Sequence, residues 1–153
     1  MNDFLVLRNQ VEEKRTRKIN HRLTANSPLA PVEKILGAFI EMIEPQVRDA
    51  VLELNRKGYS TDTSGFMNSA SSQTIEGDFI PEESLVVKLL GEGVSVETNN
   101  SGYTKIWFFP SRADIKSIRI KWIKIVSLFP DKGRQSDPSM TIKARDFRKK
   151  YES

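Results

Sequence analysis

An apolar repeat over residues 32–54 constrains the fold more than any other feature of this sequence. Its apolar residues recur at intervals of three and four, which places them along one face of a helix. Pro45 interrupts the repeat, because its ring clashes with the carbonyl of Glu41 in a continuous α-helix. The favoured interpretation is that a first helix ends near Glu44 and Pro45 opens a second; the alternative is one kinked helix. The repeat consists of Ile35, Leu36, Phe39, Ile40, Ile43, Val47, Ala50, Val51 and Leu54.

The segment after this repeat carries a helix-stop signal and then the composition of a strand. Gly58 suits the left-handed position just past a helix end, where other side chains are strained. Residues 59–64 are rich in β-branched and aromatic residues, and Gly65 marks the turn that follows. The stretch over residues 31–66 is therefore predicted to be the helix–strand unit around which the chain folds.

The rest of the chain alternates between helical and strand periodicities. Two successive strand pairs favour a four-stranded sheet, mainly antiparallel or mixed, with helices packed on it. A chain of 153 residues is long enough for one core. The prediction is an α+β fold, with a basic helix or arm at residues 1–24 and a single domain over residues 31–153. The other predicted elements are helices over 3–23, 81–90, 111–129 and 138–151 and strands over 74–80, 94–98 and 103–109.

The last predicted strand, 103–109, carries apolar side chains on both of its faces. Trp107 and Phe109 alternate with Ile106 and Phe108, which favours an interior strand covered at least in part on both sides. Trp122 shares an apolar stripe with its neighbours on the following helix. It is therefore predicted to be a core residue packed against this strand.

Several chemistries are excluded by what the sequence lacks. It has no cysteine, which removes disulfides, thiolate metal sites and a thiol nucleophile. Its single histidine, His21, lies in a basic run and forms neither a triad nor a metal site alone. No phosphate-binding glycine loop or hydrolase motif is present, so no catalytic residue and no cofactor is predicted. The early apolar run Phe4–Leu7 is too short for a signal peptide or membrane span, and a cytoplasmic protein is expected.

Charge is distributed unevenly along the chain. Residues 1–24 carry a net charge of +3, residues 25–109 carry −6 and residues 110–153 carry +7. The basic ends either neutralise the acidic centre or form a surface for an acidic partner. The leading hypothesis is a small non-enzymatic domain that binds nucleic acid backbone, or an acidic protein surface, through its basic terminal helices. The candidate nucleic-acid-binding residues are Lys116, Lys121, Lys124, Arg145, Arg148 and Lys149.

Two other hypotheses remain open from the sequence. The carboxylates Asp62, Glu76 and Asp78 alternate along strands and share one sheet face if the register permits. That arrangement would suit a cation site, a ligand-binding site or acid–base chemistry. Ile120 and Ile123 form a second, smaller apolar strip on the predicted helix 111–129. This strip is expected either to be covered by the C-terminal helix or to form an oligomer interface.

A short phrase over residues 54–66 resembles a known family. A helix ending in Leu54-Asn55, an aromatic residue, a Thr-rich strand and Ser64-Gly65 is similar to a segment of the tRNA wybutosine-synthesizing methyltransferase-like family. That family carries a Cys-Ser-Gly segment in its strand, whereas this chain has no cysteine before Ser64. The resemblance therefore implies no residue roles here.

Overall fold

The structure, a computed structural model, describes residues 3–21, 33, 36, 39–67 and 71–136, with side chains of the first helix described as far as Arg15. The described chain is a single α+β domain with one four-stranded antiparallel sheet, in agreement with the predicted class. The strand order is β1-β2-β4-β3. The strands are β1 (Ser60–Phe66), β2 (Gln73–Asp78), β3 (Ser95–Thr98) and β4 (Thr104–Phe108).

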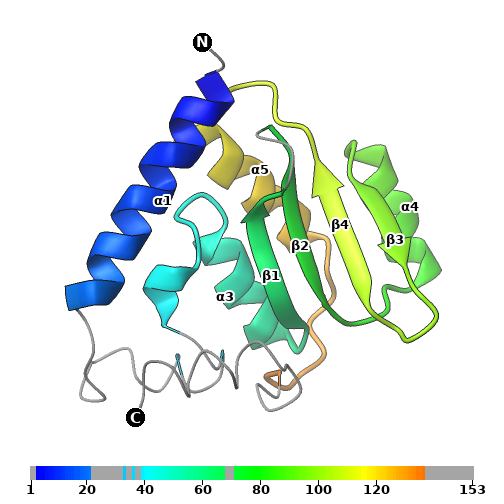
Figure 1. The fold of residues 1–153 in the computed structure, drawn as a ribbon. Helices are drawn as coiled ribbons and strands as arrows, with labels where there is room; N and C mark the ends of the chain where they lie inside the picture. Colours follow the sequence, from blue (N-terminus) through cyan, green and yellow to red (C-terminus); the bar gives the residue numbers. More distant parts are fainter. Residues whose placement is uncertain (1–2, 22–32, 34–35, 37–38, 68–70, 137–153) are drawn as a thin grey trace.

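The described helices lie behind one face of the sheet or beside its two edges. They are α1 (Asp3–His21), α3 (Arg48–Lys57), α4 (Glu83–Gly91) and α5 (Ile115–Ser127), with a 3-10 turn, η1, at Ile40–Met42. Figure 1 shows α3 and α5 behind the sheet and α4 beside β3, while none of the labelled helices lies in front of β2 and β4. The sheet therefore has one face packed on helices and one face that the described helices leave uncovered.

The break at Pro45 is confirmed, although the second helix begins later than predicted. Pro45 lies in a turn in which the amide of Val47 donates to the carbonyl of Glu44 at 3.1 Å. α3 starts only at Arg48, and η1 takes the place of a regular helix end before the turn. Most of residues 31–38 lie outside the described part. At the other end of α3, Gly58 has a φ of 104°, as its sequence position predicted.

The core lies between the sheet and α3 and α5. Trp122 is fully buried, and its ring meets Phe108 edge to face with 4.9 Å between ring centroids. The predicted contact between this helix and the 103–109 strand is therefore confirmed. Leu7 and Val11 of α1 also belong to the core, so the first half of the predicted N-terminal arm packs on the domain. Residues 138–153, predicted as a C-terminal helix, lie outside the described residues.

β4 is an interior strand, but its two faces differ. Ile106 and Phe108 are buried on the helix side. On the other side Trp107 is only half-buried and Phe109, just past the end of β4, is 66% exposed. Cover on both faces was expected at least in part. Trp107 is partly covered, although no described helix lies on this second face.

Candidate nucleic-acid interface

The loop before α5 carries an exposed cation, Arg112, beside the residue that caps this helix. Asp114 caps the helix: its Oδ1 accepts a hydrogen bond from the amide of Ser117 at 2.7 Å. Asp114 therefore occupies the cap position directly before Ile115, the first residue of α5. Arg112, in the loop between β4 and α5, is 78% exposed, with its Nε 3.6 Å from Asp114 Oδ2. Such an exposed pair leaves the guanidinium available to other anions.

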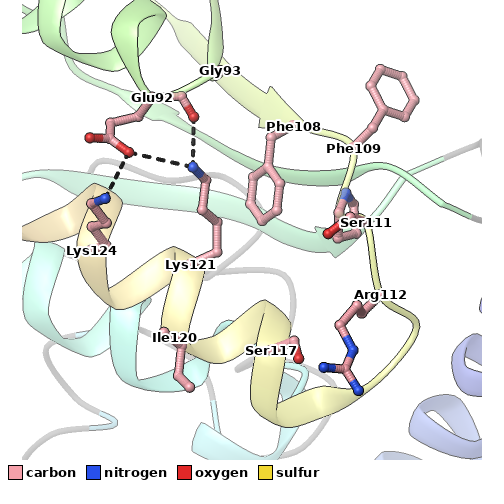
Figure 2. Close-up of a pocket in the computed structure, with 11 residues that line it drawn as sticks. Glu92, Gly93, Phe108, Phe109, Ser111, Arg112, Ser117, Ile120, Lys121 and Lys124 are labelled. Atoms are coloured by element: carbon pink, nitrogen blue, oxygen red, sulfur yellow. Dashed lines mark hydrogen bonds and ion pairs between the residues drawn. The ribbon is translucent and has the colours of Figure 1, made fainter.

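A groove of about 440 Å³ opens beside α5 (Figure 2). Its walls are the α4–β3 turn, the end of β4, the β4–α5 loop and one side of α5. Cations, hydroxyl groups and apolar side chains line it together, a composition that suits a ligand with both anionic and apolar parts. The lining residues are Glu92, Gly93, Phe108, Phe109, Pro110, Ser111, Arg112, Ser117, Ile120, Lys121 and Lys124.

Two of the groove lysines share one carboxylate. Glu92, just past the end of α4, places Oε2 3.2 Å from Lys124 Nζ and 3.6 Å from Lys121 Nζ. Lys121 also donates to the backbone carbonyl of Glu92 at 2.6 Å (Figure 2). Hydrogen bonding from Lys124 lowers the pKa of Glu92, so this carboxylate stays ionised at neutral pH. Two positive charges therefore face one negative charge here, and the local balance remains positive.

The structure brings together only some of the predicted binding residues. Lys116 is exposed on α5, while Lys121 and Lys124 line the groove. The three C-terminal candidates, Arg145, Arg148 and Lys149, lie outside the described residues. Arg112 and Phe109, which also line the groove, were not among the predicted binding residues. Their only sequence signals were the alternation of the 103–109 strand and the position of a basic residue directly after it.

The exposed apolar residues of α5 adjoin these cations. Ile120 is 58% exposed and Ile123 is 47% exposed in the described structure. The predicted cover, the C-terminal helix, falls outside the described residues. The proposal that this strip is an oligomer interface remains a prediction.

The acidic strand face is only partly assembled. Tyr103 places its hydroxyl 3.0 Å from Asp62 Oδ2 and 3.5 Å from Glu76 Oε2, so the two carboxylates meet at one phenol. Burial, followed by the charge of Asp62, raises the pKa of Tyr103, which therefore keeps its proton. Asp78 is exposed at the end of β2. Among the described residues there is no group of three or more His, Cys, Asp or Glu side chains that could hold a metal ion.

Comparison with known proteins identifies no relative of this chain. No protein-family model matches the chain, and neither the curated proteins nor the solved structures contain a significant match. The short phrase over residues 54–66 therefore remains a resemblance without further support. No described helix is long and apolar enough to cross a membrane.

Proposed function

We propose that this protein binds nucleic acid through the phosphate backbone at the α5 groove. The observation that carries the proposal is the placing of Arg112, Lys121 and Lys124 around one groove, with Lys116 exposed on the same helix. Phosphate contacts require only such a cluster of cations, and each contact releases counterions from the polyanion. The net positive charge of residues 110–153 adds a longer-range attraction for a polyanion.

The experiment is a titration of a fluorescently labelled oligonucleotide by anisotropy at several salt concentrations. Affinity is expected to fall between about 50 and 200 mM salt, with a logarithmic slope of about −2 if three phosphates of a single strand are neutralised. Arg112→Glu and Lys124→Glu should each weaken binding and flatten this slope, because each removes one phosphate contact and adds a repulsive charge.

Arg134→Glu is the matched control. Arg134 is equally a surface cation, but it follows the C-terminal end of α5, whereas Arg112 precedes the start of that helix. The charge change is identical at both positions, so a long-range effect of net charge lowers affinity in both variants alike. An equal loss in Arg134→Glu and Arg112→Glu, or no binding at low salt, contradicts a phosphate site at the groove.

A further inference from the structure

The uncovered end of β4 presents two aromatic rings on one side of the sheet. Trp107 and Phe109 are two residues apart, so an extended backbone directs both side chains to the same face. Phe109 is 66% exposed and Trp107 is half-buried. Figure 2 shows the Phe109 ring pointing outward, away from Phe108 and the groove floor. Phe109 therefore presents a planar apolar surface that the described residues leave largely open, and Trp107 presents a smaller part of its ring.

Phe109 connects the aromatic pair to the rim of the proposed phosphate site, because this residue lines the groove while its ring points outward. Phe109 lines the groove together with Arg112, which follows it by three residues. On the other side of Phe109, Lys105 places its Nζ 4.9 Å from the centroid of the Trp107 ring. Along the chain, Lys105 therefore precedes the aromatic pair and lies over the Trp107 ring, and Arg112 follows the pair. Two aromatic side chains thus lie between two basic ones along the chain. This order matches a nucleic acid strand, in which phosphates lie beside the bases.

The spacing of the two rings distinguishes nucleic acid forms. Residues i and i+2 on a strand are roughly 7 Å apart, because the rise is about 3.4 Å per residue. Neighbouring bases in a duplex are about 3.4 Å apart and are closed off by their own stacking and pairing. Two successive bases reach both rings only in an extended single strand, whose unpaired bases are free to stack on aromatic side chains.

Carboxylates on the sheet limit how far a nucleic acid strand can extend over it from the end of β4. Glu76 and Glu97 flank Lys105 on the neighbouring strands, and Asp62 lies beyond Glu76 on β1. They repel a phosphate chain, so it cannot continue across the sheet towards β1. The footprint on the sheet is therefore short and confined to the end of β4.

We infer that the site is selective for single-stranded nucleic acid, with one base stacked on Phe109 and the next on Trp107. This inference rests on the proposed function and adds the form of nucleic acid that the site takes. Lys105 moves from the Trp107 ring to the adjacent phosphate when a base stacks there, which its flexible stem permits. The phosphates on the other side of Phe109 meet Arg112 and Lys124.

The first test compares single-stranded and duplex oligonucleotides of the same length by anisotropy. Phe109→Ala should weaken single-strand binding about tenfold, as expected for one lost base stack, and leave duplex affinity unchanged. The salt slope should stay the same, because no phosphate contact is removed. Val87→Ala is the control, since Val87 is similarly exposed at 64% but lies on α4.

The second test uses the intrinsic fluorescence of the protein. The chain has two tryptophans, and Trp122 is fully buried, so quenching by an added single strand reports on Trp107. Trp107→Phe should abolish the quenching while keeping most of the affinity, because a phenyl ring still stacks. Trp107→Ala should lose both the quenching and much of the affinity for single strands.

The outcomes separate the two proposals. If the wild-type protein binds neither form at low salt, the proposed function and this inference both fail. If it binds duplex and single strand equally and Phe109→Ala matches Val87→Ala, the groove binds backbone and the inference alone is wrong. Single-strand preference lost in Phe109→Ala and Trp107→Ala, with quenching confined to proteins that contain Trp107, supports it.

Discussion

The two faces of the sheet bury the same residue types to different extents, and β4 shows the difference most clearly. On the helix face, Phe108 packs edge to face on the buried ring of Trp122. On the other face, Trp107 and Phe109 keep part of their surface in solvent. Alternate side chains of one strand thus either fill the core or remain available to a ligand. Whether an aromatic residue of β4 belongs to the core depends on which neighbours cover it, and only the less covered rings are open to the proposed stacking.

The largest expected effect comes from removing a ring on the covered face. Trp122→Ala should lower the free energy of unfolding by about 3–5 kcal/mol, the range for a large buried aromatic that leaves a cavity. Trp107→Ala, its counterpart on the other face, should cost less, about 1–2 kcal/mol, because part of its ring already lies in solvent. Urea denaturation followed by circular dichroism measures both.

This pair of variants tests the comparison directly. Equal losses of stability in Trp122→Ala and Trp107→Ala would mean that the second face is also covered in the folded protein. In that case Trp107 is a core residue and the stacking surface proposed above does not exist. A clearly smaller loss of stability in Trp107→Ala than in Trp122→Ala keeps part of the Trp107 ring available for binding.

Carboxylates of this protein also differ in how far they are buried, and Glu44 is a buried example. Glu44, at the turn before α3, is 4% exposed and accepts hydrogen bonds from the amide of Phe66 at 3.1 Å and from Gln46 Nε2 at 2.7 Å. Gly65 makes room for it, since a Cβ there would lie 2.3 Å from the Glu44 carboxyl carbon. Burial raises the pKa of Glu44 above its usual 4.5, despite Arg15 Nη1 at 3.8 Å.

This raised pKa predicts an intermediate effect that depends on pH. The folded state holds the Glu44 proton more tightly than the unfolded chain does, so the associated stability is present below about pH 4.5 and is lost as pH rises through the folded-state pKa. Glu44→Gln keeps an oxygen acceptor for Phe66 without the charge, and should remove this part of the pH dependence.

Urea midpoints measured across this pH range give the comparison. Glu97→Gln, an exposed carboxylate on β3, serves as the control and should leave the fall in stability in place. If the Glu44→Gln profile overlays that of the wild type, the carboxyl is ionised in the folded protein and the pairing with Arg15 outweighs its burial.

The sequence was sufficient wherever local chemistry decides the structure. Gly58 ends α3 because its backbone conformation favours glycine, and the apolar stripe of α5 correctly identified Trp122 as core. The sequence was not sufficient where segments that are distant along the chain meet in the fold. Asp62 reaches Tyr103 only through the irregular register between Thr61 and Thr63, which no periodicity encodes.

The candidate site illustrates the same limit. Lys121 and Lys124 were selected from helical spacing, but Glu92, which pairs with both, comes from a different element and depends on how α4 and α5 approach each other. Likewise, the alternation of β4 placed Trp107 and Phe109 on one face. Only the arrangement of the helices shows that the described structure leaves this face uncovered.

The smallest expected effect concerns Glu92, which pairs with the groove lysines Lys121 and Lys124. A phosphate entering the groove must displace Glu92 from Lys124 and Lys121, so the carboxylate competes with the ligand. Glu92→Gln removes the competing charge and should raise affinity for single strands about two- to fivefold, with a steeper salt dependence. Glu83→Gln, which removes the same charge from the first turn of α4, should have almost no effect when measured by anisotropy. A loss of affinity in Glu92→Gln would instead mean that Glu92 positions the lysines for binding, and that the groove is preorganised by this contact rather than restrained by it.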